Sequence, residues 1–203
     1  MQLQIIGDGA FGSFLKELLT PHFDIVPSAD SIILAVPISA YDSVASANYG
    51  KHLINVCSVQ KPSTDICLRY SDRVTSIHPL FGRRTPEGKR NSILTYKFVA
   101  DNDTWFSKAD IEFEFLNLFI RVSSILQANG TKKFTPESHD ILMAKTHVAA
   151  LMGAQQLKVW TERAKDIPDE LIPNSFRLMR DFVKTLDDMP HGTVESIMAN
   201  PYV

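Results

Sequence analysis

Short apolar runs alternate with amphipathic stretches along the first 126 residues. Nearly continuous β-branched and aliphatic runs are typical of strands buried on both faces, as in a parallel sheet between helices. Alternating strands and helices predict an α/β fold with a Rossmann-like, doubly wound, mostly parallel sheet. The predicted strands are Gln2–Ile6, Phe23–Val26, Ser31–Pro37, Leu53–Val56, Val74–Ile77, Ile93–Ala100 and Arg121–Leu126.

Amphipathic segments between these runs predict the helices that cover the sheet. Pro62 lies near the start of one of them, where its missing N–H costs nothing because the first helical N–H groups have no intrahelical acceptor. The predicted helices are Phe11–Leu19, Ser39–Asn48, a short helix that begins at Lys61, and Trp105–Leu118.

The pattern changes after a polar linker, Gln127–Phe134, which contains the turn signal Asn-Gly. Thr135 can act as an N-cap, with Pro136 at the first helical position. We therefore expect a dinucleotide-binding domain over residues 1–130 and a small, all-helical C-terminal domain over residues 131–203. The predicted helices of the second domain are Thr135–Arg163, Ser175–Leu186 and Thr193–Met198.

A glycine-rich loop joins the first predicted strand to the first predicted helix. Its residues Gly7, Gly9, Ala10, Phe11 and Gly12 form the pattern G-x-G-x-x-G. Such a loop allows a tight turn, a close approach of the backbone to a pyrophosphate, and close packing of helix on strand. The alternative is a turn that holds no ligand. The strand before the loop and the helix after it favour a dinucleotide, NAD or NADP.

The edge that would bind the adenosine half of a dinucleotide looks abridged. Only Pro27–Asp30 separates two predicted strands, whereas a parallel crossover needs a dozen or more residues. An acidic residue about 20 positions after the glycines, which would bind the ribose hydroxyls, is not clearly present. Asp24 lies inside a strand, and Ser28 is the polar residue nearest the strand end. We expect Ser28 to contact the cofactor, and both NAD and NADP to be used.

Three later strands end in residues suited to a site, because ligands of open α/β sheets bind at the carboxyl ends of the strands. Val36 and Pro37 follow one strand and are expected to contact the cofactor. Ser58 and His78 follow the next two and could both reach a substrate beside the nicotinamide. A histidine can accept the proton of an alcohol while hydride leaves the same carbon. The alternative is a loop histidine bonded to a backbone carbonyl.

Two histidines mark the start of the predicted C-terminal helices. His139, Met143 and His147 share one helical face. This spacing permits a metal site, but a third ligand and an H-E-x-x-H motif are missing, so we expect no metal. We favour two histidines that face an acidic ligand, with a structural interface as the alternative. Arg177 and Lys184 lie on a later helix and either bind a carboxylate or form a solvated face.

Composition narrows the possible partners. The formal net charge is -2, which gives no basic surface for nucleic acid. No apolar run approaches the length of a membrane span, and no charged leader or signal segment precedes the first strand. Two cysteines, Cys57 and Cys67, make neither a disulfide framework nor a metal set. The sequence therefore predicts a cytoplasmic protein with a small-molecule substrate.

Five segments in this order resemble prephenate and arogenate dehydrogenases. Each segment alone is weak evidence for this family. A His-Pro-hydrophobic-Phe-Gly motif after a strand, followed by His-Asp at the start of a helix, is a combination that is fairly specific for it. The resemblance covers most of the chain, including a helical second domain. The segments are Gly7–Gly12, Ile33–Pro37, Cys57–Gln60, His78–Gly82 and Ser138–Asp140.

The resemblance implies an activity. The enzymes of this family oxidise the ring alcohol of prephenate or arogenate with NAD(P)⁺, and loss of the ring carboxylate then makes the ring aromatic on the route to tyrosine. His78 matches the histidine that hydrogen-bonds the ring hydroxyl and takes its proton, and Ser58 matches the serine near that hydroxyl and the nicotinamide. His139 and Asp140 match the motif that opens the dimer-forming helix.

The chain also departs from the family pattern. The family usually has Gly-Ser-Val-Lys where this chain has Cys57-Ser-Val-Gln60, so one positive charge is missing. The family's carboxylate-binding arginine falls near Lys184, while Arg177 matches an arginine at the start of the same helix. A lysine would hold a carboxylate as a point charge rather than through a bidentate fork. We expect His139, His147, Arg177 or Lys184, besides Ser58, to contact the substrate.

The predicted C-terminal helices offer more apolar surface than so short a domain can cover. Ala149–Ala154, Leu157 and Trp160 make the first of them apolar around much of its girth. We expect a two-fold homodimer joined through these helices, as the resemblance also implies. Two other functions stay open: a reductase of another small imine or keto compound, and a non-catalytic binding or regulatory relative, which the abridged adenosine edge supports.

Overall fold

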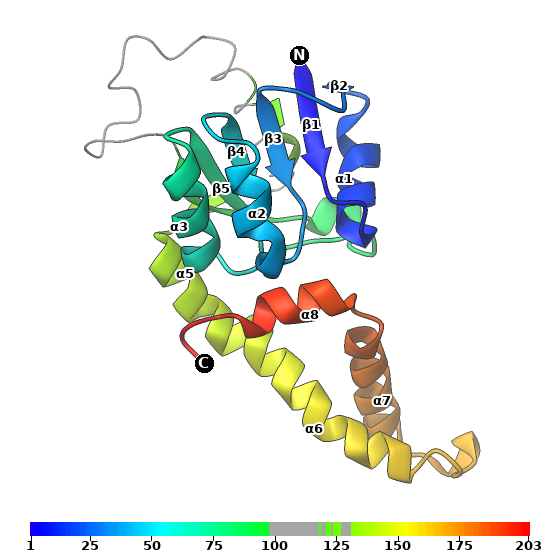
Figure 1. The fold of residues 1–203 in the computed structure, drawn as a ribbon. Coiled ribbons are helices and arrows are strands. Elements are labelled where there is room, and N and C mark those ends of the chain that lie inside the picture. The colour runs from blue at the N-terminus through cyan, green and yellow to red at the C-terminus, as the bar shows by residue number, and fades with distance from the viewer. Residues whose placement is uncertain (98–117, 119–120, 123, 127–130) are drawn as a thin grey trace.

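The computed structural model describes residues 1–97, 118, 121–122, 124–126 and 131–203 (Figure 1). Seven strands form one sheet in the order β2-β1-β3-β4-β5-β6-β7. The strands from β1 to β5 run parallel, β6 runs antiparallel to β5, and β7 runs parallel to β6. The strands are β1 Gln2–Ile6, β2 Asp24–Ile25, β3 Ser31–Leu34, β4 His52–Asn55, β5 Val74–Pro79, β6 Ser92–Lys97 and β7 Thr131–Lys133.

Helices cover both faces of the parallel strands. On one face α1 (Ala10–Leu19) packs with the helical residues Leu118, Val122 and Leu126 against side chains of β1, β3 and β4. On the other face α2 (Tyr41–Ser46) and α3 (Lys61–Tyr70) cover a second apolar cluster. The predicted α/β, doubly wound and mostly parallel sheet is confirmed.

Two predictions near the end of the sheet were wrong. Residues 121–122 and 124–126 are helical, whereas we predicted a strand over Arg121–Leu126. The reason is that Leu118, Val122 and Leu126 repeat every four residues and bury one helical face in the core. The predicted linker contains β7, which pairs with β6 at Ser92. Of the helix predicted over Trp105–Leu118, the structure describes Leu118 alone, which is helical.

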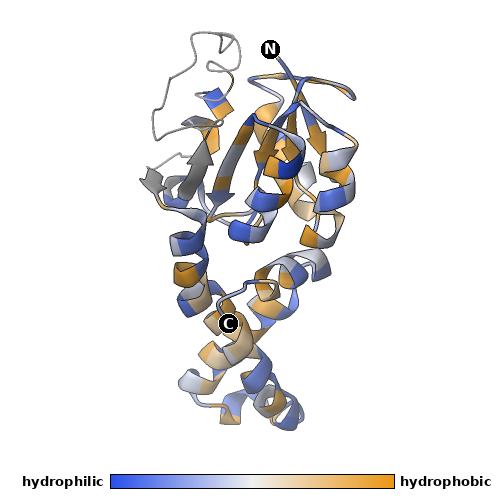
Figure 2. Cartoon of the chain, turned by 60° about the vertical axis from the view of Figure 1, so that its left-hand side comes forward, coloured by the Kyte–Doolittle hydropathy of each residue, from blue (hydrophilic) through white to orange (hydrophobic). Residues whose placement is uncertain are grey.

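The C-terminal helices form an arm that extends below the sheet in Figure 1. A long helix begins as predicted after the Thr135 N-cap, whose hydroxyl accepts the N–H of Ser138. The arm helices mix hydrophobic and hydrophilic residues along their length (Figure 2). The elements are α5 Pro136–Met143, a π-helical segment η3 over Ala144–Val148, α6 Ala149–Arg163, α7 Asn174–Asp187 and α8 His191–Met198.

The short connection between β2 and β3 has a simple explanation. The two strands are not neighbours but lie on either side of β1, so no helical crossover joins them. β2 ends level with Leu3, whereas β1 continues to Ile6. The Val26 N–H then donates to the Leu3 carbonyl, and Gln4 Nε2 donates to the Pro27 carbonyl at 2.8 Å. In the described part of the chain, nothing pairs with the outer side of β2.

Two glycines of the glycine loop are required by packing. Gly7 has a φ of 123°, in the region that favours glycine, and a Cβ there would overlap the carbonyl of Ala35. A Cβ on Gly12 would overlap the carbonyl oxygen of Gly7. Gly9 differs, because a Cβ built on it meets no heavy atom within 4 Å. The loop therefore holds α1 tightly against the end of β1 and leaves open space beside Gly9.

This difference predicts opposite effects of the same substitution. Gly12→Ala should lower the free energy of unfolding by roughly 1–3 kcal/mol, because the added methyl forces backbone atoms apart. The matched control Gly9→Ala should change it by less than about 0.5 kcal/mol. Urea denaturation followed by circular dichroism measures both. Equal losses in the two variants would contradict the packing described for Gly12.

Candidate active site

The glycine loop can hold an anion. The first intrahelical bond of α1 runs from the Ser13 N–H to the Gly9 carbonyl at 2.9 Å. The N–H groups of Ala10, Phe11 and Gly12 precede that bond and have no acceptor within the helix. Gly9 and Ala10 are exposed. Together with the open space beside Gly9, these donors fit the pyrophosphate of a dinucleotide.

The loop also carries an acidic residue, Asp8, whose charge is compensated. Lys16 Nζ, from the second turn of α1, lies 2.6 Å from Asp8 Oδ1. The hydrogen bond and the positive charge of Lys16 lower the pKa of Asp8. The pair is exposed, so its contribution to stability is small. The Lys16 ammonium reduces the repulsion that the Asp8 carboxylate would exert on a bound phosphate.

Helix α8 packs against the residues that follow β3. Val36 is half-buried and Pro37 is exposed at this strand end. The Ile38 N–H donates to Ser196 Oγ at 3.2 Å, and a Cβ on Gly192 would lie 2.7 Å from Pro37 Cγ. The arm thus returns to the carboxyl edge of the sheet, and α8 borders the place where we expected Val36 and Pro37 to contact a cofactor.

His78 meets His139 at the end of β5. Its Nδ1 lies 2.8 Å from His139 Nε2, and the two rings are nearly perpendicular with centroids 5.0 Å apart. His78 is 3% exposed and His139 is fully buried. Burial is the main cause that lowers the pKa of His78 well below its usual value, and the positive charge that His139 or His147 would carry when protonated adds to it. His78 is therefore a neutral base at neutral pH.

Asp140 continues this chain of hydrogen bonds. Its Oδ1 lies 2.7 Å from His139 Nδ1 and accepts the Gln60 N–H at 2.8 Å, while Oδ2 accepts the Lys61 N–H at 2.8 Å. Those two N–H groups open α3, where the helix dipole favours a negative charge. Both ring nitrogens of His139 are thus engaged. In this arrangement His139 has no ring nitrogen left to hydrogen-bond a substrate, and its expected substrate contact stays a prediction.

A π-helical turn brings a third histidine to His78. The segment Ala144–Val148 interrupts the long arm helix, and such segments are frequent at functional sites. The His147 ring stacks on His78, with centroids 6.1 Å apart and planes 23° apart. His147 is half-buried, and burial lowers its pKa, with a smaller effect of the His139 charge. His147 therefore remains placed to contact a substrate at His78.

Ser58 follows the strand next to that of His78. It lies three residues beyond Asn55, which pairs with Ser76 of β5, and it is half-buried. The intervening turn is held by Asn55, whose Oδ1 accepts the Cys57 N–H at 2.9 Å and the Tyr41 hydroxyl at 2.8 Å. Sequence reasoning missed this role of Asn55, because a buried asparagine at a strand end carries no signal that identifies its partners.

Three expected site residues lie away from the histidines. Ser28 lies in the β2–β3 connection, at the edge of the sheet opposite the glycine loop (Figure 1). Arg177 and Lys184 are exposed on α7, which packs on α6 and runs from the far tip of the arm back toward α8 (Figure 1). Arg177 Nη2 donates to the Asp169 carbonyl at 2.6 Å. Within one chain, none of these residues joins His78.

Other features of the described chain complete this account. Residues that the structure describes contain no group of three or more histidine, cysteine or acidic side chains suited to a metal ion. Cys57 and Cys67 are free and buried, and burial raises their thiol pKa values to about 11 and about 12. No described helix is long and apolar enough to cross a membrane.

Neither a protein-family model nor a curated protein matches this sequence. Solved structures do match. Prephenate dehydrogenase from Aquifex aeolicus, in complex with hydroxyphenyl propionate and NAD⁺, has a TM-score of 0.70 at 16% identity, over 98% of this chain and 82% of that one.

Two further structures agree. A putative prephenate dehydrogenase from Corynebacterium glutamicum has a TM-score of 0.67 at 19% identity, over 97% of this chain and 73% of that one. Synechocystis arogenate dehydrogenase has a TM-score of 0.57 at 15% identity, over 98% and 84%. The chain therefore has the fold of prephenate and arogenate dehydrogenases, and the resemblance seen in the sequence motifs is confirmed at the level of the fold.

The buried histidine predicts a pH dependence of stability. Because the pKa of His78 is lower in the folded protein than its usual value of 6.5, the unfolded chain binds a proton that the folded chain does not. The free energy of unfolding should therefore fall as pH drops below about 6.5, by up to about 1.4 kcal/mol per pH unit for this group. His78→Asn should show a shallower slope than the parent in urea titrations between about pH 5 and 6.5. Equal slopes in the parent protein and in His78→Asn would contradict the lowered pKa of His78.

Proposed function

We propose that this protein is an NAD(P)-dependent dehydrogenase that oxidises the ring alcohol of prephenate or arogenate and releases the ring carboxylate. One observation carries the proposal: a buried, neutral base, His78, is hydrogen-bonded to His139 at the same sheet edge as an open glycine loop. The fold shared with dehydrogenases of these two substrates supports it. The cytoplasm and the route to tyrosine are the setting that the resemblance implies.

The cofactor would be held mainly through its pyrophosphate. The N–H groups of Ala10 and Phe11 and the open side of Gly9 would receive it, with Val36 and Pro37 beyond. When bound, it would supply the hydride acceptor of the reaction. The sheet offers little to the adenosine ribose, because β2 stops level with Leu3. We therefore propose that NAD and NADP are both used. The expected contact of Ser28 with the cofactor stays a prediction.

Residues of this chain would accept the hydroxyl proton of the substrate and hold the hydroxyl group in place. As the C–H bond of the alcohol gives up its electron pair, the hydroxyl proton passes to His78 and a carbonyl group forms. The C–C bond to the ring carboxylate would then break, carbon dioxide would leave, and the bonding electrons would pass through the ring to the carbonyl oxygen. This oxygen would take up a proton and become the hydroxyl group of an aromatic ring. Ser58 would hydrogen-bond the same hydroxyl, and His147 would contact the substrate from the arm. The lowered pKa of His78 keeps its imidazole free to accept the proton.

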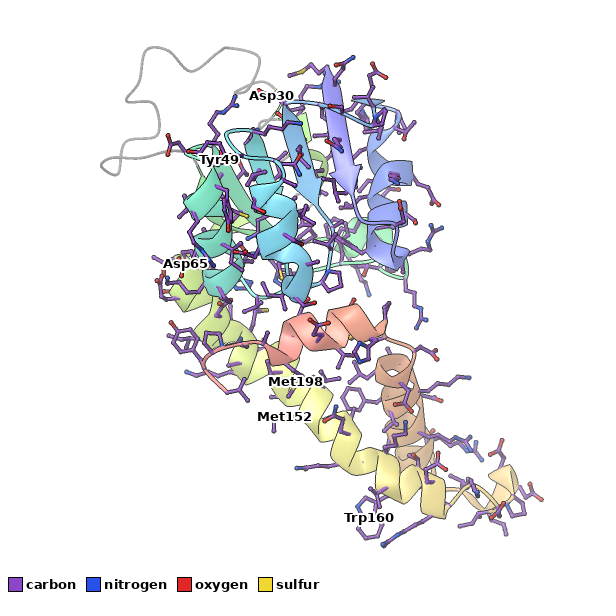
Figure 3. All side chains as sticks on the ribbon, viewed as in Figure 1. Asp30, Tyr49, Asp65, Met152, Trp160 and Met198 are labelled. Atoms are coloured by element: carbon purple, nitrogen blue, oxygen red, sulfur yellow. The ribbon has the colours of Figure 1, made fainter. Side chains whose placement is uncertain are left out.

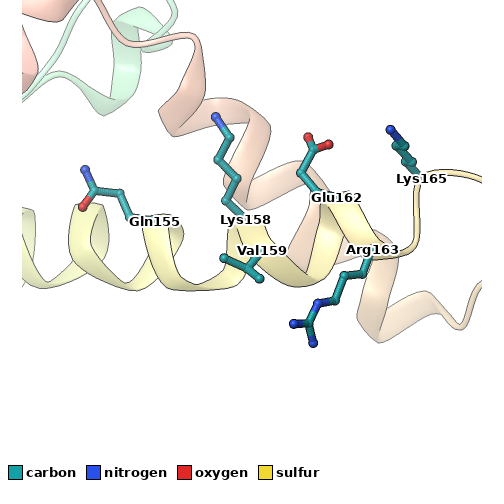
Figure 4. Close-up of a pocket in the computed structure, with 6 residues that line it drawn as sticks. All are labelled: Gln155, Lys158, Val159, Glu162, Arg163 and Lys165. Carbon is teal, nitrogen blue, oxygen red and sulfur yellow. The ribbon is translucent and has the colours of Figure 1, made fainter.

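We also propose a homodimer joined through the helical domain that we expected over residues 131–203, beside a dinucleotide-binding domain expected over residues 1–130; the first three residues of the former, Thr131–Lys133, belong to the sheet as β7. Large apolar side chains of the arm are exposed: Trp160 on α6 is 56% exposed and Leu178 on α7 is 63% exposed. Trp160 and Met152 project from α6 into solvent (Figure 3). A groove of about 530 Å³ runs along the same helix (Figure 4). Its lining residues are Gln155, Lys158, Val159, Glu162, Arg163 and Lys165.

Features of the site and of the sheet also agree with two other functions. A reductase of a small imine or keto compound would use the same glycine loop and His78 in the reverse direction, delivering a proton instead of accepting one. A non-catalytic relative would explain the short β2 and the missing adenosine contacts. Turnover of a cyclic imine with no turnover of prephenate or arogenate would favour the first. Failure to bind any nicotinamide cofactor at millimolar concentration would favour the second.

The proposed reaction is tested by one substitution. Purified protein should reduce NAD⁺ or NADP⁺ when given prephenate or arogenate. His78→Asn should lower kcat by about 10²–10⁴ while cofactor binding stays unchanged, because the variant loses the general base and keeps the glycine loop. Stopped-flow absorbance of the reduced cofactor measures the rate, and fluorescence titration measures the binding.

Ser58→Ala serves as the comparison for that variant. Ser58→Ala should lower kcat less than His78→Asn does, because it removes one hydrogen bond and leaves the base in place. A His78→Asn variant with near-normal kcat would exclude His78 as the proton acceptor.

The proposed dimer has its own test. Light scattering after size exclusion at micromolar concentration should give the mass of two chains. Trp160→Glu combined with Leu178→Glu should give one chain, because each change places a charge in an apolar interface. Tyr49→Glu is the matched control: Tyr49 is an exposed aromatic residue far from the arm (Figure 3), and its change should keep the dimer. A stable, active monomer of the parent protein would refute the assembly.

A further inference from the structure

We propose that His139 and Asp140 are positioning residues that fix the His78 imidazole as its Nδ1–H tautomer, so that Nε2 is the atom that takes the proton. The assignment of the tautomer stands on the hydrogen bonds alone. Its role in proton transfer rests on the proposed function.

The argument starts at Asp140, which is fully buried. A carboxylate can only accept hydrogen bonds. Its Oδ1 and Oδ2 accept the N–H groups of Gln60 and Lys61, both at 2.8 Å, and these fix the orientation of the carboxylate. Because Asp140 Oδ1 lies 2.7 Å from His139 Nδ1, that nitrogen must donate. His139 therefore carries its proton on Nδ1.

The same reasoning then passes to His78. A neutral imidazole with a proton on Nδ1 has its lone pair on Nε2. His139 Nε2 lies 2.8 Å from His78 Nδ1, so His78 must donate across this contact and carry its own proton on Nδ1. His78 Nε2 is left as the acceptor. In the part of the chain that the structure describes, no residue hydrogen-bonds to this Nε2.

His147, the remaining titratable group at His78, leaves this assignment intact. Its ring stacks on that of His78 with the centroids 6.1 Å apart, and this arrangement makes no hydrogen bond to either nitrogen of His78. The second possible state has a protonated His139 that donates from both nitrogens. In that state His78 Nδ1 would accept, and its proton would sit on Nε2.

The tautomer has a consequence for the reaction. When Nε2 takes the hydroxyl proton, His78 becomes an imidazolium whose Nδ1–H still donates to His139. The negative charge of Asp140, one ring away, stabilises this cation, as the buried carboxylate of a catalytic triad stabilises its histidine. At the other end, the first N–H groups of α3 hold the Asp140 carboxylate in place.

The experiment is ¹⁵N NMR of the histidine side chains in the intact protein at neutral pH, without any ligand. His78→Asn identifies the His78 signals. We expect a protonated Nδ1 and a bare Nε2 for His78. A protonated Nε2 with a bare Nδ1 would overturn the inference.

Asp140→Ala provides the decisive variant. It removes both carboxylate oxygens, so no acceptor fixes the His139 proton on Nδ1. His78 should then show a mixture of its two tautomers, and kcat should fall by about 10⁴ with KM nearly unchanged, as on removal of a triad carboxylate. An unchanged His78 tautomer in folded Asp140→Ala would refute the role of Asp140. Should this variant not fold, the ¹⁵N spectrum of the parent protein still tests the tautomer.

Asn200→Ala is the matched control. Asn200 is buried and donates to the Asp140 main-chain carbonyl at 2.8 Å, so it touches the same residue but not the carboxylate. Its change should leave the His78 tautomer as in the parent, and a reversal there would count against the inference. The two proposals fail separately: a bare Nε2 with no turnover of prephenate or arogenate refutes the proposed function alone.

Discussion

The carboxylate of Asp140 at the start of α3 is the interaction on which the site depends. It lies on the arm, yet both of its oxygens accept N–H groups from the sheet domain, at Gln60 and Lys61. A buried carboxylate without such donors would cost several kcal/mol. Asn200 adds a bond to the main-chain carbonyl of the same residue. Docking of the arm and orientation of His139 at His78 are therefore one structural event.

The two sides of the parallel sheet differ in how far their strands pair and in how many buried polar groups they hold. Toward β5, polar side chains are buried and paired, with Asn55 holding the turn before Ser58 and His139 meeting His78. Toward β2, the sheet stops after two residues of pairing. Chemistry in open α/β sheets occurs where strands direct side chains at a ligand, whereas the adenosine end contributes mainly affinity. The chain thus concentrates its buried polar groups at the place where we propose that a proton is transferred.

The sequence allowed the parallel sheet and the glycine loop to be predicted because their patterns are local. Aliphatic runs identify β1, β3 and β4, and the loop needs only glycine spacing. The prediction of a strand over Arg121–Leu126 was wrong because periodicity alone cannot distinguish a short apolar strand from a buried helix. The strand Thr131–Lys133 was missed because it is short and polar and depends on pairing with β6. In both segments, contacts with residues distant in the sequence determine the secondary structure.

The site shows the same limit more sharply. His78 and His139 each carried a visible signal, but 61 positions separate them, and only the fold reveals that one orients the other. Arg177 and Lys184 were assigned from their place on a helix, α7, which runs from the far tip of the arm back toward α8 (Figure 1). Just beyond Lys184, Asp188 Oδ2 lies 3.6 Å from Arg84 Nη1, in the loop that follows β5. The C-terminal end of α7 therefore faces the same end of the sheet as His78, whereas Arg177 lies nearer the tip of the arm. The direction in which α7 runs separates the two candidates, and only the fold reveals that direction.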